Sequence, residues 1–193
     1  MLLAAHVMRR LTVQTERIGL HMAAPKKKDP QRQLQGFLSR QKGKRFEDLI
    51  SLSLEYYREK GFADIDKNHE PMKVLRSLGE GRFVCCFEKK AQPDYKGCIK
   101  GGREIMFEAK YTDSDRILQS RVGDDQGKYM TRRQKLGARC YVICGFPSGD
   151  VYRVPWDTWQ NMKECFGHKY ATEQDLQQYR VTVHWNGILL LLD

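Results

Sequence analysis

Two acidic residues and one lysine have the types and the spacing needed to act together on a phosphodiester bond. Asp94 begins one extended run of residues, and Glu108 and Lys110 lie near the end of the next. The Gly101-Gly102 pair between the runs predicts a two-residue hairpin turn, which places Asp94 opposite about position 109 and so beside Glu108. Glu108 and Lys110 are two residues apart on one strand, so their side chains emerge on the same face. We therefore expect two carboxylates and an ammonium group on one small patch.

Such a patch suits metal-assisted hydrolysis. Carboxylate oxygens are hard ligands for Mg²⁺, and a bound magnesium ion keeps positions free for water and phosphate. The metal lowers the pKa of its bound water and offsets charge on the phosphate, while a lysine can orient the water or donate a hydrogen bond. The alternative is that Asp94 only begins a turn after Pro93, with Glu108 and Lys110 as a surface pair. The apolar run around Glu108 favours the functional interpretation, because placing charged side chains among apolar residues costs free energy unless they are paired or bind a metal.

The surrounding sequence predicts a mixed α/β architecture. From Gly43 to Lys60 the apolar residues recur at helical spacing, and Gly61 ends the helix. Further helices are expected at 124–136, at 156–166 and, shorter, from Thr172. Strands are expected at 82–88, 94–99, 104–110, 139–146, 151–154 and 180–185, with a buried strand at 187–192. The order is thus a helix, three strands, a helix and a strand, followed by a C-terminal α/β elaboration.

The positive charge of the chain is concentrated near its start. The 193 residues carry a formal net charge of +10, and residues 1–45 contain eleven Lys or Arg against two acidic residues. We expect a basic, disordered arm at 1–35 and one folded domain at 36–193. Basic arms commonly bind nucleic acid; the alternative is a solvated tail without a partner.

The composition and the order of residues argue against several other classes of protein. No apolar run approaches the ~20 residues of a membrane span. The apolar start, residues 1–8, is followed by arginines rather than preceded by a positive region, which is the wrong order for a secretion signal and only weakly resembles a transit peptide. Met22 is an alternative start. None of the six cysteines forms a CxxC pair, so we expect no zinc site and a reducing, cytoplasmic location.

The three candidate catalytic residues, Asp94, Glu108 and Lys110, also match a known sequence motif. Pro93-Asp94 followed by Glu108-Ala109-Lys110 fits the PD-(D/E)xK nuclease motif. A longer set of residues resembles the RecU-type Holliday junction resolvases, also called penicillin-binding-protein-related factor A. The resemblance covers roughly residues 36–155 and rests on these segments: Gly43–Glu47, Asp94–Gly97, Gly101–Arg103, Phe107–Lys110 and Gln126.

The resemblance implies a restriction-endonuclease-like core, a homodimer, and paired incisions in four-way DNA junctions; the composition already argues against a membrane partner. It implies that Asp94 and Glu108 ligate Mg²⁺, with Mn²⁺ as an alternative, and that Lys110 handles the attacking water. Glu47 would support the metal, although it could be only a helix-start acid. Gln126 would position water or phosphate, although it could be a solvated helix residue. Members also have a stalk before the motif aspartate, which the stretch 67–92 does not match closely.

Basic residues on two further segments are candidates for DNA binding. Lys128, Arg132 and Lys135 share one face of the expected helix, a spacing that suits a phosphate backbone but also an ordinary solvated face. Lys73 and Arg76 lie in the stalk-like stretch. In the expected helix at 156–166, Trp156, Trp159 and Phe166 fit a core better than base stacking.

Two other functions compete with junction resolution. One is a PD-(D/E)xK nuclease that cuts duplex or flapped DNA. The other is a DNA-binding accessory protein of recombination without catalysis, which the intact set of Asp94, Glu108 and Lys110 argues against, because a pure binder has no use for it.

Overall fold

The structure is a computed structural model that describes residues 30–69, 71–87 and 92–192. The expected arm at 1–35 therefore lies almost wholly outside the described residues. The helices are α2 (Pro30–Glu59), α3 (Asp124–Lys135), α4 (Trp156–Gln160) and α5 (Met162–Phe166), with 3-10 turns at Gln119–Arg121 and Gln177–Tyr179. The strands are β1 (Ala63–Lys67), β2 (Met72–Gly79), β3 (Arg82–Phe87), β4 (Tyr95–Ile99), β5 (Arg103–Tyr111), β6 (Arg116–Leu118), β7 (Arg139–Gly145), β8 (Val151–Pro155) and β9 (Tyr170–Thr172).

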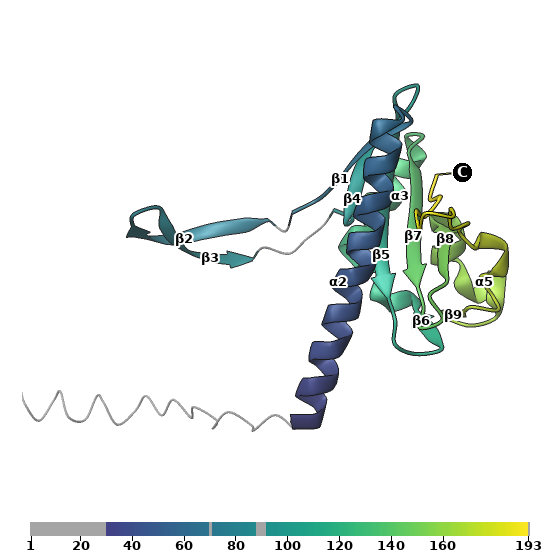
Figure 1. Cartoon of the computed structure of the whole chain (residues 1–193), viewed down its shortest axis with the longest axis horizontal. Coiled ribbons are helices and arrows are strands. Elements are labelled where there is room, and N and C mark those ends of the chain that lie inside the picture. The colour runs from purple at the N-terminus through teal and green to yellow at the C-terminus, as the bar shows by residue number, and fades with distance from the viewer. Residues whose placement is uncertain (1–29, 70, 88–91, 193) are drawn as a thin grey trace, which may run out of the picture. The chain divides into compact units, whose positions relative to one another are not determined.

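Five of these strands form one mixed sheet in the order β1-β4-β5-β7-β8 (Figure 1). Strands β5 and β7 run parallel, and the other neighbours run antiparallel. The parallel pair requires a crossover, which contains α3. The sequence order of helix, antiparallel strands, helix and parallel strand is the restriction-endonuclease-like core that the resemblance implied.

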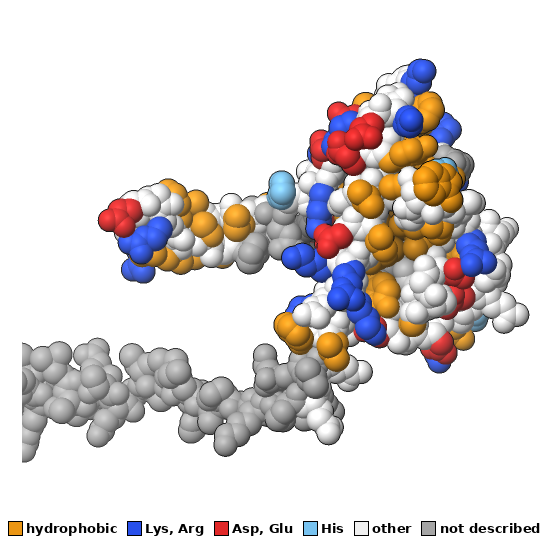
Figure 2. Space-filling model, viewed as in Figure 1, with side chains coloured by type: hydrophobic (Ala, Val, Ile, Leu, Met, Phe, Trp, Pro, Cys, Tyr) orange, Lys and Arg blue, Asp and Glu red, His pale blue; other side chains and the backbone are white. Residues whose placement is uncertain are grey.

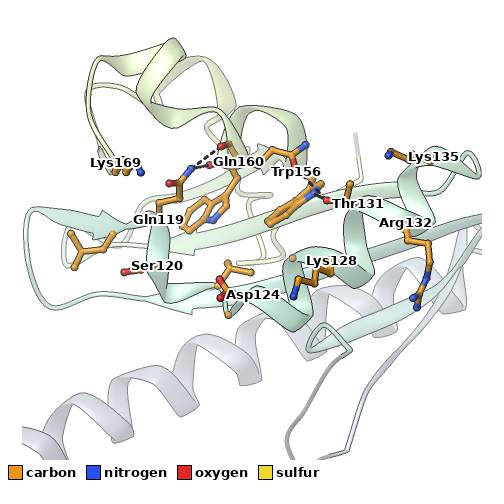
Figure 3. A pocket seen from close by; sticks show the side chains of 15 residues that line it. Gln119, Ser120, Asp124, Lys128, Thr131, Arg132, Lys135, Trp156, Gln160 and Lys169 are labelled. Carbon is orange, nitrogen blue, oxygen red and sulfur yellow. Dashed lines mark hydrogen bonds between the residues drawn. The ribbon is translucent and has the colours of Figure 1, made fainter.

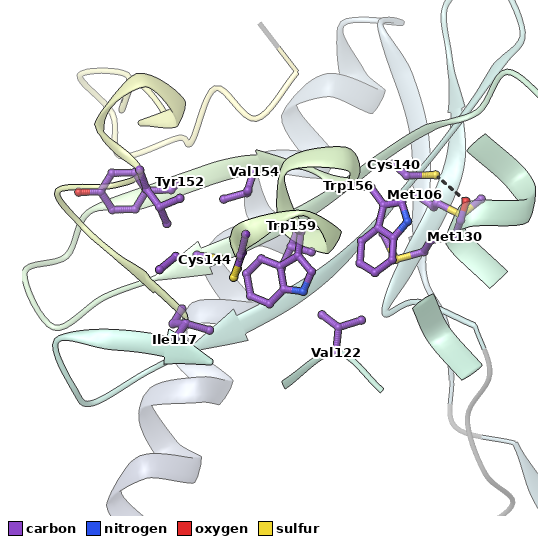
Figure 4. Packing of buried hydrophobic residues seen from close by; sticks show 14 of the residues in the cluster. Met106, Ile117, Val122, Met130, Cys140, Cys144, Tyr152, Val154, Trp156 and Trp159 are labelled. Carbon is purple, nitrogen blue, oxygen red and sulfur yellow. Dashed lines mark hydrogen bonds between the residues drawn. The ribbon is translucent and has the colours of Figure 1, made fainter. Parts of the chain in front are cut away.

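Apolar side chains cover both faces of this sheet. One face packs against α2, whose Phe46, Ile50 and Leu54 are at most 5% exposed and share a cluster with Phe107 of β5. The opposite face packs against α3, α4 and α5 (Figure 4), where Met106, the neighbour of Phe107, joins the other buried cluster. Successive residues of β5 therefore point to opposite faces, as the pleat requires.

Helix α2 lies unusually close to the end of β7. A Cβ atom added to Gly145 would come within 2.8 Å of the Phe46 ring. Gly145 is paired with Tyr111, at the end of β5 that carries Glu108 and Lys110. The absence of a side chain at Gly145 thus lets α2 approach the part of the sheet where the chemical residues lie.

Strands β2 and β3 form a separate antiparallel hairpin. All eight residues of β2 are exposed. Hydrophobic side chains lie along the hairpin and charged ones at its tip (Figure 2), where Arg82 pairs with Glu80 at 3.1 Å. The turn places Gly79, Glu80 and Gly81 at positive φ. A hairpin with both faces exposed contributes little to a hydrophobic core.

Several expected elements differ from the structure. The strand expected at 82–88 exists, but it pairs with β2, and the charged strand β1 takes the place beside β4 in the core sheet. The first helix begins at Pro30 rather than Gly43. The helix expected at 156–166 is divided at Asn161. The loop between β4 and β5 has three residues, because Ile99 pairs with Arg103.

The C-terminal expectations were also partly wrong. Residues 173–176 form turns after β9 rather than a helix. The segments 180–185 and 187–192 make isolated bridges, including Val183 with Leu189, instead of strands. The apolar character of the last segment still buries Leu189 and Leu191, which are 4% and 1% exposed. Among the described residues, no helix is long and apolar enough to cross a membrane.

Candidate active site

Asp94, Glu108 and Lys110 converge at one end of the antiparallel pair β4–β5. The Lys110 Nζ lies 2.5 Å from Glu108 Oε1 and 3.9 Å from Asp94 Oδ2. The backbone holds both acids: the Asp94 N–H donates to Glu108 Oε2 at 3.0 Å, and the Ala109 N–H donates to Asp94 Oδ2 at 3.1 Å. The three-residue turn puts Asp94 directly across from Glu108, one position closer than the two-residue turn predicted.

Glu108 is the most buried member of this set. Its side chain is 1% exposed, against 17% for Asp94 and 18% for Lys110. Burial, and then the negative charge of Asp94, raise the pKa of Glu108 to about 6, while Lys110 acts in the opposite direction. A buried carboxylate held near a second one is poised to take a cation, because a positive ion relieves both the desolvation and the repulsion.

Gln126 reaches the same carboxylate from helix α3. Its Nε2 donates to Glu108 Oε1 at 2.9 Å, and its Oε1 accepts from the Gly123 N–H, which precedes the helix, at 3.2 Å. Both ends of the amide are thus used, and the first turn of α3 is tied to β5. The structure brings Gln126 to the set as expected, in contact with Glu108.

Glu47 lies on α2 and is paired with a residue that the sequence did not indicate. Its Oε2 is 2.6 Å from the Nζ of Lys67, at the end of β1. In the described part of the chain, no three His, Cys, Asp or Glu side chains are grouped closely enough to hold a metal ion together. Asp94 and Glu108 are the two carboxylates that lie together with Lys110 in this arrangement.

These residues open onto a cleft between α2 and the ends of the strands. It has a volume of about 830 Å³, and Glu47, Asp94 and Lys110 are among its lining residues. Three basic residues also line it: Arg40, Lys44 and Arg121. Sequence reasoning missed Lys67 and Arg121, because neither β1 nor the 3-10 turn that contains Arg121 was predicted.

The candidate DNA-binding residues fall into two groups. Lys128, Arg132 and Lys135 line one pocket beside α3 (Figure 3), which supports their expected common face. Lys73 and Arg76 lie on β2 of the separate hairpin, both exposed. The structure therefore does not bring these two groups together on one element.

A divalent metal fits the donor set of the site. Mg²⁺ prefers oxygen ligands and is commonly held by one or two carboxylates, with water or phosphate in the other positions. Asp94 and Glu108 supply two such groups with oxygens already directed at one cation, the Lys110 ammonium. The open cleft leaves room for the remaining ligands.

The fold and this site together define a nuclease of the restriction-endonuclease-like class, with PD-(D/E)xK residues at the ends of β4 and β5. The chain belongs to the family described as RecU, Recombination protein U, whose model matches residues 41–191.

Proteins similar to the chain carry the same family name. The Holliday junction resolvase RecU of Geobacillus kaustophilus (strain HTA426) is 26% identical over 148 residues, covering 72% of this chain and 74% of that protein. The Holliday junction resolvase RecU of Streptococcus pneumoniae (strain Hungary19A-6) is 27% identical over 121 residues, covering 59% and 61%. Among solved structures, the Holliday junction resolvase Hjc of Archaeoglobus fulgidus matches at 17% identity with a TM-score of 0.41, covering 71% of this chain and 88% of that one.

Proposed function

We propose that this protein is a divalent-metal-dependent endonuclease that resolves four-way DNA junctions during recombination and repair. The observation that carries the proposal is the convergence of Asp94, Glu108 and Lys110 within a chain of the RecU family. Members of the family are named Holliday junction resolvases. The alternatives are a nuclease for duplex or flapped DNA and a DNA-binding protein without catalysis.

Asp94 and Glu108 would hold the metal, which we propose is Mg²⁺, with Mn²⁺ as the alternative. When bound, such an ion supplies an activated water and neutralises charge on the phosphate. Lys110 lies between both carboxylates, so its ammonium group can turn toward a phosphate oxygen or an incoming water. Gln126 donates to the same Glu108 oxygen as Lys110 does, and so helps to hold the carboxylate. The pair Glu47–Lys67 borders the cleft, where Glu47 can support the metal through a water rather than as a direct ligand.

The DNA partner would contact basic side chains around this centre. Lys128, Arg132 and Lys135 on α3, and Lys73 and Arg76 on the hairpin, suit phosphate contacts. A four-way junction offers two equivalent strands, so a two-fold symmetric dimer matches it and we propose a homodimer. We place the protein in the cytoplasm, with the basic arm at 1–35 as an additional DNA contact to the domain at 36–193.

The proposal is tested with a synthetic four-way junction and a matched linear duplex at equal concentration, with magnesium and with a chelator. We expect cleavage of the junction only with the metal, and much less cleavage of the duplex. Equal cleavage of both substrates would favour the alternative of a nuclease that cuts ordinary duplex DNA. Cleavage of neither substrate would favour the alternative of a DNA-binding protein without catalysis.

Two variants test the site residues in the same assay. Asp94→Asn and Glu108→Gln should abolish cleavage while they retain junction binding, because each removes one charged metal ligand and little volume. Glu59→Gln, at the exposed end of α2, is the matched control and should cleave normally. Retained cleavage in Asp94→Asn or Glu108→Gln would contradict the assignment.

A further inference from the structure

One cation of the active-site cleft is held next to Lys110. Arg121 lines the cleft and lies in the 3-10 turn Gln119–Arg121. Its Nη2 donates to the backbone carbonyl of Tyr111 at 3.3 Å. Tyr111 follows Lys110 on β5, so this hydrogen bond ties the guanidinium group to the end of the strand that carries the candidate catalytic lysine.

The charges of Lys110 and Arg121 also act on one residue of β7. Cys144 is paired with Lys110 across the sheet and is fully buried. Burial raises the pKa of the Cys144 thiol, and the charges of Lys110 and Arg121 act to lower it. Two cations from different elements therefore lie near the same thiol, which agrees with the contact between Arg121 and the end of β5.

The turn that carries Arg121 is anchored to the rest of the fold. The Nε2 of Gln119 donates to the backbone carbonyls of Trp159 and Gln160 at 2.8 and 2.9 Å (Figure 3). Val122, which follows the turn, is 7% exposed. Arg121 itself is exposed. A side chain that reaches solvent from an anchored backbone can hold a ligand in a defined place.

The positive charge of Arg121 has no carboxylate partner within the described ranges. Two acidic residues of the cleft are instead paired with lysines: Asp113 with Lys42 at 2.7 Å, and Glu47 with Lys67 at 2.6 Å. A guanidinium group has five N–H donors, and the backbone carbonyl accepts from one of them. The other donors and the charge are therefore available to an anion in the cleft.

Two further cations line the cleft from α2, namely Arg40 and Lys44. In the part of the chain that the structure describes, neither side chain takes part in a hydrogen bond or an ion pair that would hold it, whereas the neighbouring Lys42 pairs with Asp113. Both can add positive charge to the cleft. Arg121 differs from them because its guanidinium group is held in place.

We propose that Arg121 binds a phosphate of the cleaved DNA strand beside the bond that is cut, and so positions the scissile phosphate at the candidate metal site. A guanidinium group can bind two phosphate oxygens through parallel N–H bonds, which fixes the orientation of the phosphate as well as its position. The inference rests on the proposed function, and it adds a positioning residue that lies outside the PD-(D/E)xK motif.

The distance between the two cations fits neighbouring phosphates. Adjacent residues of a protein chain are about 3.8 Å apart, and one DNA strand advances about 3.4 Å per nucleotide. A phosphate at Lys110 therefore has its neighbour on the strand about one or two nucleotides away, within reach of a cation tied to Tyr111.

Two substitutions separate the charge of Arg121 from its contact with the backbone. Arg121→Gln removes the charge but keeps an N–H donor for the Tyr111 carbonyl, and Arg121→Lys keeps the charge. Arg103→Gln is the matched control, because exposed Arg103 also donates to a backbone carbonyl, that of Gly137 at 2.8 Å, at the other end of β5. Melting curves establish that each variant is folded.

Binding of the full-length protein to a four-way junction is measured in a chelator, so that no strand is cut. Each junction of a series has one phosphate replaced by a neutral methylphosphonate. For the parent and Arg103→Gln, we expect one such replacement near the cut to weaken binding about tenfold, and for Arg121→Lys to a smaller extent. Arg121→Gln should bind the unmodified junction about tenfold more weakly, and the same replacement should have no further effect.

Cleavage with magnesium then relates this phosphate to the cut. The bond that the parent cuts should lie within about two nucleotides of the phosphate that Arg121 binds. At saturating enzyme, Arg121→Gln should cleave the junction about tenfold more slowly or worse, because a misplaced phosphate reacts slowly even when the DNA is bound.

The outcomes separate this inference from the proposed function. A phosphate that the parent and Arg121→Lys sense, and Arg121→Gln does not, supports the contact. If no phosphate shows this pattern, Arg121 only holds the end of β5 and the inference is overturned. A cut far from the sensitive phosphate, or an unchanged cleavage rate in Arg121→Gln, overturns the positioning role. The binding series does not depend on cleavage, so a parent that binds without cutting refutes the proposed function while the series still decides the Arg121 contact.

Discussion

Gln126 donates its amide N–H to the buried carboxylate of Glu108 at 2.9 Å, and the other end of the same amide accepts from the Gly123 N–H. This connects the start of α3 to the strand that carries the candidate metal ligand. An amide held at both ends keeps the Glu108 carboxylate in one orientation, which is the usual contribution of a residue that contacts a metal ligand rather than the metal.

Replacing Gln126 should therefore impair metal binding more than DNA binding. Gln126→Ala leaves one Glu108 oxygen without this donor, and we expect a loss of about 10–100-fold in metal affinity or cleavage rate. Cleavage at increasing Mn²⁺ or Mg²⁺ concentration measures the effect, and excess metal should rescue part of it. Gln134→Ala removes a hydrogen bond to Asp157 from the same helix and is the control. A Gln126→Ala enzyme with normal metal dependence would show that the contact has no role in the site.

The raised pKa of Glu108 predicts a pH dependence of stability in the metal-free protein. Burial and Asp94 raise this pKa from 4.5 to about 6, so the folded state binds the proton more tightly than the unfolded state does. Protonation thus stabilises the fold, and stability declines as the pH rises from about 4.5 through 6. Above this window the charged Glu108 reduces the free energy of unfolding by about 2 kcal/mol, at 1.36 kcal/mol per pKa unit.

Glu108→Gln should therefore melt at a higher temperature than the parent at pH 8 in a chelator, by about 4–8 °C. The difference should shrink as the pH falls through 6 and disappear well below pH 4.5, where Glu108 is protonated in both the folded and the unfolded state. Glu59→Gln, a change of the same kind at an exposed position, should show no such difference at either pH. Equal melting temperatures of Glu108→Gln and the parent at pH 8 would mean that burial of the charged Glu108 carboxylate does not destabilise the fold.

Adding a divalent metal should reverse the order of the two melting temperatures, so that the parent melts above Glu108→Gln at pH 8. A ligand that binds only the folded state raises stability by about 2.7 kcal/mol at a hundredfold excess over its dissociation constant. The parent has two charged ligands, so Mg²⁺ or Mn²⁺ should raise its melting temperature at pH 8. Asp94→Asn and Glu108→Gln should respond little. If the melting temperature of either variant rises as much as that of the parent, the metal binds elsewhere.

The close approach of α2 to the sheet predicts a sensitive position outside the site. In Gly145→Ala the new methyl group would lie 2.8 Å from the Phe46 ring, and overpacking of this kind typically reduces stability by about 1–3 kcal/mol. Phe46 precedes Glu47, so cleavage should also decrease. Gly43→Ala is the control, because nothing lies within 4 Å of its Cβ position and alanine favours the helix by about 1 kcal/mol. Denaturant unfolding of both variants measures the difference.

The elements predicted best from the sequence are those that depend on the local pattern of apolar and turn residues. The helix at α3, the strand at β7 and the hairpin that carries Asp94 and Glu108 followed from apolar spacing and from the Gly101-Gly102 turn. Even the one-residue error in the turn left Asp94 beside Glu108, because neighbours across a sheet are close at either register. The convergence of these residues was therefore accessible from the sequence.

The predictions that were wrong concern elements whose structure depends on contacts between distant segments of the chain. Strand β1 contains three charged residues among five, so its apolar signal is limited to Ala63 and Ile65, and its place beside β4 is decided by pairing rather than by composition. The ion pair of Lys67 with Glu47 followed from that pairing and could not be predicted without it. The C-terminal run is apolar enough for a strand, but it is buried as an irregular segment whose Leu189 N–H bonds to Ser53 of α2.

The basic arm gives a prediction that is independent of the active site. Residues 1–29 contain six Lys or Arg, and they precede the first described residue of α2, Pro30. If these cations neutralise DNA phosphates, removing residues 1–29 should weaken junction binding. The slope of log affinity against log salt should then decrease by about 0.9 for each phosphate that is no longer neutralised, or about five at most. Removing only residues 1–8, which contain no Lys or Arg, should leave the slope unchanged. Binding measured at several salt concentrations decides the matter, because a slope that stays the same after removal of 1–29 would mean that the arm binds no phosphate.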